Sequence, residues 1–383
     1  MNIIDSAPQV NDAGTAAILG CGQVRPKTTA EPFKLPDGLS PGVALAHRCS
    51  ESLDRGIIPS LTWRRLGRAQ KLALMAAQQA LKDFEIPPDA YERAAVCLGT
   101  GLGELGETAA FLENLIRLDE REPRPTRFTN SVHNSLASQV AIQFRLGGEN
   151  HTITHGPVSF ELAIWQAMVL LKTGRAGYVL ACGVDELNPY AAYAGYDLGL
   201  WRITGGPQPP GRNRLGRLPG TFPGEGAAAF LLGDSKFGSS TPYIKAVKVR
   251  PLTVGDLTRV SPEEEVNFLN QTITAAGLNF GDLDLILTGA DCEAQLRDLY
   301  LPSVTALSKA GGKEIGCGLY KNLCGEFCSA SAIGLALAVE MLQVNQIPPG
   351  LMIRGGREPT GMNNILLYQI AKPGFHSACL VGR

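Results

Sequence analysis

The chain lacks an excess of charge of either sign. Lys and Arg number 35 against 36 Asp and Glu, the formal net charge is −1, and 19% of the 383 residues are charged. Nucleic-acid-binding proteins usually carry a basic stripe, and the sequence has none, so we expect no nucleic-acid partner. No apolar run approaches the roughly 18–20 residues that a membrane-spanning helix needs. We therefore also expect no membrane span.

Targeting, disulfide, metal and cofactor patterns are lacking too. The first residues, MNIIDSAPQVNDAG, do not have the charged-then-apolar layout of a signal peptide. Nine cysteines are scattered through apolar segments, which favours a reducing, cytoplasmic location over a disulfide framework. Cys324 and Cys328, with Cys317 nearby, have no histidine near them in sequence, so we interpret them as buried thiols and expect no metal. The glycine-rich turns at 99–103 and 224–226 lack phosphate-binding frames, and we expect no cofactor.

Apolar segments of helical and strand type alternate along the chain. With 44% hydrophobic residues, it can bury a large core as one big domain or two intimate ones. The alternation predicts an α/β fold with sheets buried on both faces. The order of elements repeats weakly, which predicts two halves at 12–235 and 240–383. Residues 32–60 and 201–223 are predicted to be irregular. The pattern predicts strands at 16–24, 94–98, 177–183, 227–232, 283–288 and 377–381, and helices at 70–84, 107–118, 132–144, 266–276 and 324–342.

One segment has the shape of a nucleophile site without its nucleophile. Residues 148–167, GENHTITHGPVSFELAIWQA, are predicted to form a strand, a tight turn and a buried helix. Enzymes that form acyl-thioesters present a cysteine at such a helix N-terminus, because the helix dipole and free N–H groups lower the thiol pKa. Here the turn consists of Gly156, Pro157 and Val158.

Seven sequence blocks in order carry a family resemblance. The chain resembles the β-ketoacyl synthases of the thiolase fold over nearly its whole length. The resemblance implies a thiolase-like α/β fold, in which two duplicated halves form an αβαβα layered core. The blocks are CLGTGLGELGETAAFLENL (97–115), TRFTNSVHNSLASQVAIQFRLGGENHTITHGPVS (126–159), LACGVDE (180–186), PGEGAAAFLLG (223–233), LILTGAD (285–291), YKNLCGEFCSASA (320–332) and GFHSACLVGR (374–383).

The resemblance implies a catalytic cysteine and two histidines, and this sequence has none of the three. The cysteine position holds Pro157, the first histidine position holds Thr288, and the second holds Glu326. The family lysine that precedes the second histidine by five residues is retained as Lys321. Condensation needs a thiolate to carry the acyl chain and donors to stabilise an enolate. Proline offers no nucleophile and no N–H, and an ionised glutamate would repel a developing anion.

The silent subunits of this family, often called chain-length factors, give the best match to such a pattern. The resemblance therefore predicts a non-catalytic subunit in type II fatty-acid or polyketide (aryl-polyene-like) biosynthesis. It would form a heterodimer with an active β-ketoacyl synthase through the region around 126–165. The acyl chain would arrive on the phosphopantetheine arm of an acyl carrier protein. A homodimeric acyl-binding scaffold remains an alternative, as does a divergent acyltransferase or hydrolase.

Several residues are candidates for these roles. In the enzyme alternative, Ser159 with His155 four positions earlier would form a serine–histidine pair, or a cysteine such as Cys182 would be the nucleophile. Four arginines in the 201–223 loop could steer an acidic carrier protein: Arg202, Arg212, Arg214 and Arg217. By the resemblance, the candidates for limiting chain length are Leu105, Phe111 and Leu112. The possible pocket residues also include His133, His155, Ser159 and His376.

Overall fold

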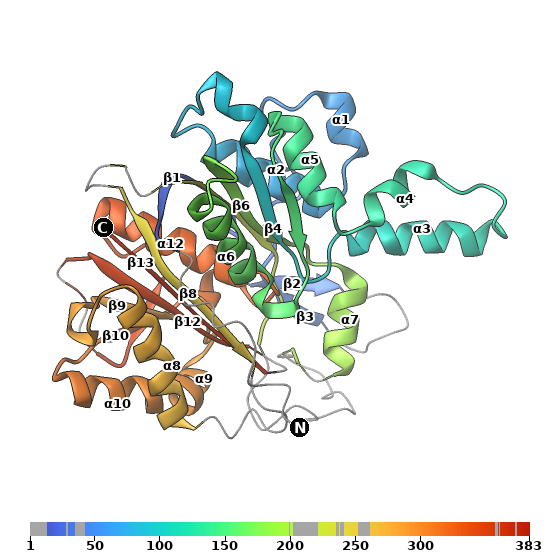
Figure 1. Ribbon diagram of the computed structural model, residues 1–383. Helices are drawn as coiled ribbons and strands as arrows, with labels where there is room; N and C mark the ends of the chain where they lie inside the picture. Colours follow the sequence, from blue (N-terminus) through green and yellow to red (C-terminus); the bar gives the residue numbers. More distant parts are fainter. Residues whose placement is uncertain are drawn as a thin grey trace, which may run out of the picture.

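The structure is a computed structural model. It describes residues 14–27, 30–34, 43–198, 200–201, 221–234, 237, 241–251, 261–356, 359, 361–371 and 374–383. Within these residues the chain forms one large mixed sheet of eleven strands and a separate two-stranded sheet. Helices cover both outer faces of the large sheet and fill the space between its two halves (Figure 1).

The two halves of the large sheet share one topology. In each half, the first strand pairs antiparallel with the last, the last pairs antiparallel with the strand before it in the chain, and two parallel strands follow. The halves meet where Ala16 pairs with Ile244 and Ala17 with Tyr243. The first half runs β1 (Ala16–Val24), β7 (Gly226–Gly233), β6 (Tyr178–Asp185), β4 (Ala95–Gly99), β5 (Asn150–Ile153). The second runs β8 (Tyr243–Pro251), β13 (Phe375–Gly382), β12 (Asn364–Ala371), β9 (Leu285–Thr288), β10 (Gly316–Leu319), and ends at β11 (Met352–Arg354).

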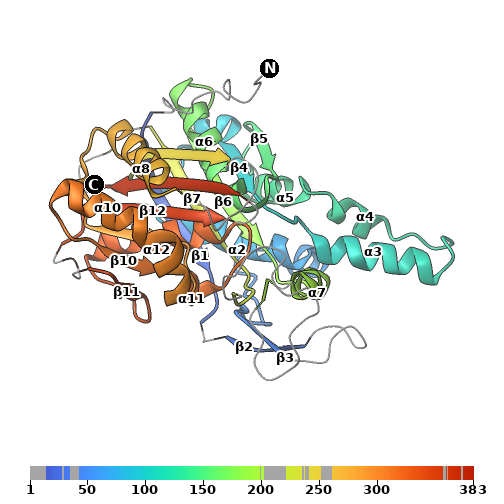
Figure 2. The same cartoon turned by 90° about the horizontal axis from the view of Figure 1, so that it is seen from below.

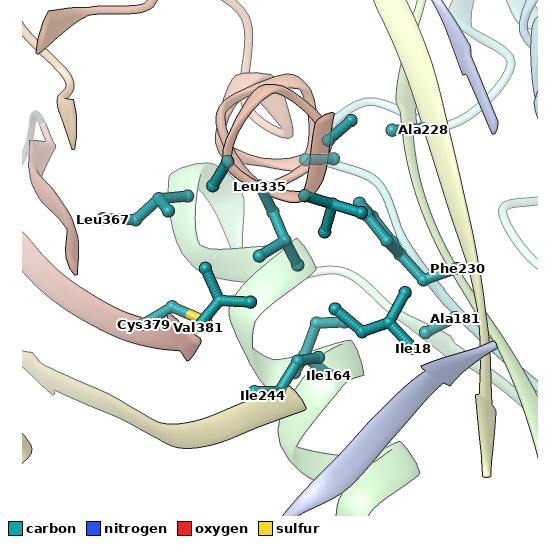
Figure 3. Close-up of a cluster of buried hydrophobic side chains, with 14 of the residues drawn as sticks. Ile18, Ile164, Ala181, Ala228, Phe230, Ile244, Leu335, Leu367, Cys379 and Val381 are labelled. Carbon is teal, nitrogen blue, oxygen red and sulfur yellow. The ribbon is translucent and has the colours of Figure 1, made fainter. Parts of the chain in front are cut away.

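Two buried helices form the central layer. Helix α6 (Ser159–Lys172) packs on β4, β6 and β8, and α12 (Ala330–Val344) packs on strands of both halves. Helix α12 is rich in Ala and Leu and is buried over almost its whole circumference, as a helix between two sheets must be. In Figure 3, Leu335 of α12 and Ile164 of α6 lie between Phe230 on one side and Leu367 on the other.

Amphipathic helices form the two outer layers. Helices α2 (Arg68–Ala80) and α5 (Ser135–Phe144) cover the first half of the sheet, while α8 (Pro262–Ala275) and α10 (Leu301–Gly311) cover the second. The order helix, sheet, helix, sheet, helix is the αβαβα arrangement that was predicted, with its duplicated halves. The exact boundaries 12–235 and 240–383 stay a prediction.

Most of the predicted strands and helices are confirmed, and two predicted segments differ. Residues 32–60 are not irregular throughout, because β2 (Glu31–Lys34) pairs with β3 (Val43–Ala46). The predicted helix 132–144 begins only at Ser135, since a separate helix α4 (Pro125–Ser131) ends just before Val132. The pattern also missed helices α1 (Ser60–Arg65) and α7 (Pro189–Asp197) and strands β8 and β12. Of the predicted 201–223 excursion, residues 202–220 lie outside the described residues.

Helices α3 (Leu105–Arg117) and α4 form an arm that projects from the body of the molecule (Figures 1 and 2). The two helices pack on each other, and Phe111 and Phe128 lie with their ring centroids 5.5 Å apart. No residue of α3 is buried, although its sequence is amphipathic. The arm therefore presents an apolar face that the described chain does not cover.

Candidate functional site

The turn before α6 has the predicted geometry for presenting a side chain. Gly156, Pro157 and Val158 form one 3₁₀ turn, and α6 begins at Ser159. Gly156 has φ +54°, a left-handed conformation that glycine adopts at little cost. The Gln369 Nε2 group of β12 donates a hydrogen bond to the Pro157 carbonyl at 3.0 Å. The second half of the protein thus holds the turn in place.

Ser159 is a structural residue at this helix start. It is fully buried, its hydroxyl donates to the Gly156 carbonyl at 2.7 Å, and it accepts from the His155 N–H at 2.8 Å. The His155 ring packs edge-on against Phe375, with the centroids 4.9 Å apart. A hydroxyl that donates to a backbone carbonyl does not offer its proton to a histidine base. This geometry gives no support to the predicted serine–histidine pair.

Thr288 closes β9 and is also fully buried. Its hydroxyl donates to the Gly318 carbonyl on the neighbouring strand β10 at 3.1 Å. The hydroxyl is therefore committed to the sheet. The next residue, Gly289, contributes to the wall of the cavity described below.

Glu326 is held by a buried lysine. The Lys321 ammonium lies 2.9 Å from Glu326 Oε1 and 2.7 Å from Oε2, and Lys321 is 2% exposed. Gly325, at φ +76°, turns the chain between them, and its Cα lies against the backbone of Gly224. A Cβ atom at Gly224 or at Gly325 would clash with the backbone of the other segment, so the two segments cross at this point. The close crossing fixes Glu326 at its place.

A cavity of about 470 Å³ brings together two of the three positions that the resemblance matches to the catalytic residues. Pro157 and Glu326 share its wall with Gly289, whereas Thr288, which precedes Gly289 in the chain, does not line it. The volume falls within the range of small-molecule sites. The remaining wall is formed mostly by apolar side chains of the 102–105 turn, α7, the 200–201 segment and the 327–328 and 370–371 segments, including Leu102, Leu105, Leu198, Leu200, Trp201, Leu299, Phe327 and Ile370.

Carboxyl groups form the polar part of this wall. Asp185 is fully satisfied, since its Oδ1 accepts from the Gly101 N–H at 2.8 Å and its Oδ2 from the Ser329 hydroxyl at 2.7 Å. Glu186 follows it, and its Oε1 accepts from the Gly106 N–H at 2.6 Å. Burial, together with the nearby Glu225 carboxylate, raises the pKa of Glu186 to about 7. Burial and Glu186 likewise raise the pKa of Glu104, at the start of α3, above its usual range.

The other predicted pocket residues lie in different places. Leu105 lines the cavity, and its role in limiting chain length stays a prediction. Phe111 and Leu112 are on the arm, away from this cavity, and Leu112 is 50% exposed. His133 is exposed beside the arm, with its ring against Gly103.

His376 does not occupy the predicted place at the mouth of the site. It is completely buried on β13 under α8, and its Nδ1 lies 2.7 Å from Glu265 Oε1. Arg250 and Tyr368 also bind Glu265. Burial and the Arg250 guanidinium lower the pKa of His376 to about 3, so the imidazole is neutral near neutral pH. The prediction placed it by sequence position in a loop, whereas the strand turns its side chain to the opposite face.

The cysteines have the environment of structural thiols. Cys182 is buried in β6, and burial raises its thiol pKa far above the ordinary value, which disfavours a nucleophilic role. Cys324 is fully buried, whereas Cys328 is half-buried and lines the cavity. Within the described residues, no three metal-type side chains are grouped.

Two functional features were missed by the sequence reasoning. The first is helix α7. Its small residues Ala191, Ala194 and Gly195 form the far wall of the cavity together with Trp201. Its signal was Asn188–Pro189, because the Asn188 side chain accepts from the Tyr190 N–H as a helix cap. The second is Glu186, which lies in the sequence block LACGVDE (180–186) but was not predicted to be a site residue.

Comparison with known proteins identifies the fold. A β-ketoacyl synthase from Burkholderia phymatum matches with a TM-score of 0.75 at 18% identity, over 97% of this chain and 99% of that one. A ketosynthase in complex with its chain length factor from Xenorhabdus doucetiae gives a TM-score of 0.73 at 15% identity, over 96% of this chain and 98% of that one. The protein therefore has the thiolase-like fold of the ketosynthases.

Sequence comparison agrees with this fold. Residues 56–236 match the family model for the β-ketoacyl synthase N-terminal domain. A Schizosaccharomyces pombe protein assigned as a mitochondrial 3-oxoacyl-(acyl-carrier-protein) synthase is 27% identical over 238 residues, which are 58% of this chain and 55% of that relative. The chain thus spans about half the length of this relative. These findings show that this part of the chain is similar in sequence to β-ketoacyl synthases. Among the described helices, none has the length and apolar character needed to cross a membrane.

Proposed function

We propose that this chain, with the fold and the N-terminal domain signature of β-ketoacyl synthases, is a non-catalytic ketosynthase-like subunit of type II fatty-acid or polyketide biosynthesis. The observation that carries the proposal is the cavity wall. At the positions where the family resemblance calls for a thiol and one imidazole, it contains Pro157 and Glu326, and Thr288 at the third position does not reach it.

Each substitution removes one part of the condensation chemistry. Pro157 can form no thioester and has no backbone N–H to bind an oxyanion. The Thr288 hydroxyl donates to Gly318 instead of pointing into the cavity. Glu326 is an acceptor paired with Lys321, and a carboxylate near a developing enolate is unfavourable. The same wall also disfavours decarboxylation, which needs the same donors.

The arm formed by α3 and α4 supports pairing with a second subunit. Ile116 is 81% exposed, Phe128 56% and Leu112 50%, and all three lie on this projecting element. Exposed apolar clusters of this kind mark protein interaction sites. One structural neighbour is a ketosynthase bound to its chain length factor. By analogy, we propose that the arm, with the adjoining 126–165 region, contacts an active synthase in a heterodimer.

In this complex the chain would help to limit the length of the acyl product. The growing acyl chain would be attached to the phosphopantetheine arm of a carrier protein. Phe111 and Leu112 on the arm could then reach the pocket of the partner, while Leu105 bounds the chain's own cavity. The four arginines proposed to steer the carrier, Arg202, Arg212, Arg214 and Arg217, lie outside the described residues.

The first experiment is the intact mass of the purified chain after incubation with labelled acyl carrier protein. We expect no acyl-sized gain, because no described cavity-lining residue is an activated nucleophile. A gain that survives Ser159→Ala and is lost on mutation of a cysteine would identify a private nucleophile and refute the silent-subunit role. Co-expression with a cognate synthase should in turn change the length distribution of its products.

The homodimeric acyl-binding scaffold is the second candidate, since the same apolar arm could pair with another copy. Native mass spectrometry separates the two. A heterodimer that forms when the synthase is added favours the proposed role, and a homodimer that ignores it favours the scaffold.

A further inference from the structure

The cavity continues beyond Pro157 into a region that the proposed pairing does not use. Its far wall consists of the small-residue face of α7 and the indole of Trp201. The Trp201 ring lies against Gly195, where a Cβ would clash with it, and its Nε1 donates to the Ala192 carbonyl at 2.7 Å. The polar side of the indole is thus satisfied internally. What faces the cavity on this side is apolar surface.

Glu186 presents a carboxyl group to this region of the cavity. It is 7% exposed and lines the cavity. Its Oε1 accepts from the Gly106 N–H, whereas for Oε2 the described part of the chain offers no hydrogen-bond donor. A ligand that donates a hydrogen bond to this oxygen would replace the water that otherwise solvates it.

The surroundings of Glu186 are acidic. Glu104 and Glu107 lie on the α3 side and Glu225 on the other. The nearest guanidinium, Arg68, is already bound to Glu225, at 2.8 Å from Oε2 and 2.6 Å from Oε1. No lysine or arginine lines the cavity within the residues that the structure describes. A carboxylate placed here would face like charges, and none of the described lining residues would serve as its counter-ion.

We propose that this cavity binds an apolar ligand with a hydrogen-bond donor group, and that the donor binds Glu186 Oε2 while the apolar body lies against α7 and Trp201. The ligand class is then an alkyl amine or alcohol, and alkyl carboxylates are disfavoured. The inference does not depend on whether the chain pairs with a synthase, because the whole cavity wall described here belongs to one chain.

Three probes of the same length test the proposal: octylamine, 1-octanol and octanoate, each titrated calorimetrically into the intact protein at pH 8. Octylamine should bind most tightly, octanol more weakly, and octanoate at least tenfold more weakly than octylamine. Octanoate affinity equal to or greater than that of octylamine overturns the proposal. Lack of binding by all three probes overturns it as well.

Variants locate the contact. Glu186→Gln keeps an acceptor for the Gly106 N–H but removes the charge, so octylamine should bind about tenfold more weakly while octanol changes little. Glu113→Gln is the matched control, because it removes one carboxylate from an exposed position on α3 and should leave all three affinities unchanged.

Ala191→Phe should lower the affinity for every probe, because the larger side chain fills the space at the far wall of the cavity. An unchanged amine-to-alcohol ratio in Glu186→Gln refutes the role of this residue. Unchanged affinities in Ala191→Phe refute the location.

Discussion

The Lys321–Glu326 pair gives the sharpest test of how the altered site is held together. The two side chains differ in burial, because Lys321 is 2% exposed whereas the Glu326 side chain is 30% exposed and borders the cavity. Removing one partner of a buried pair typically costs 3–5 kcal/mol, since the remaining charge has no counter-ion. The two single variants should therefore differ in stability.

Glu326→Gln leaves the buried ammonium uncompensated, and we expect a loss of about 3 kcal/mol, near the low end because the carboxylate is partly hydrated. Lys321→Met leaves a carboxylate that cavity water can solvate, so we expect about 1 kcal/mol. An unfolding entropy near 2.1 cal/mol/K per residue amounts to about 0.8 kcal/mol/K for a chain of this length. The corresponding decreases in Tm are about 4 °C and about 1 °C.

Differential scanning calorimetry at pH 7 measures both values. The double variant should lie close to Lys321→Met, because the second substitution then removes no ion pair. Arg117→Met is the control, since it breaks the exposed pair with Glu113 and should cost less than about 0.5 kcal/mol. If Lys321→Met is as destabilising as Glu326→Gln, or if Glu326→Gln resembles the surface control, the reasoning from burial is wrong.

Three further changes probe the arm, the turn and the acidic wall. Ile116→Glu should abolish co-purification with a synthase partner and leave the Tm of the isolated chain within about 1 °C, because the side chain is 81% exposed. Ser159→Ala should lower stability by about 1 kcal/mol in a denaturant titration without affecting any acyl transfer, because the hydroxyl only bonds the backbone. Burial raises the pKa of Glu186 from 4.5 to about 7 in the folded state, so ionisation of this group opposes folding as pH rises through that interval. Relative to wild type, Glu186→Gln should therefore gain stability between pH 5 and pH 8, by up to about 3 kcal/mol, and a pH-independent difference would contradict the assignment.

The sequence predicted the architecture better than the site because the two depend on different information. Apolar periodicity located β1, β4, β6, β9 and the buried helices, since burial on both faces leaves long apolar runs. Strand β8 was missed because its lysines and arginine interrupt that run, and part of the strand faces solvent.

Site residues could be predicted from the sequence only where the local backbone geometry fixes the direction in which the side chain points. Pro157 and Glu326 sit at a helix start and a glycine turn, which fix the side chain locally, and both line the cavity. His376 lies in a strand, where a shift of one residue moves a side chain to the other face, and there the prediction was wrong. The free oxygen of Glu186 depends on contacts between segments 80 residues apart, which periodicity does not encode.

The positions that the resemblance matches to the catalytic triad are packed into their surroundings. The retained Lys321 is bound by Glu326, and the Thr288 hydroxyl donates to Gly318. Gln369 donates to the backbone carbonyl of Pro157, which a cysteine at this position would offer as well. A change of Glu326 or Thr288 to histidine would therefore break one of these contacts without supplying the other two reacting groups. If the proposed role holds, selection on such a chain acts through what it binds.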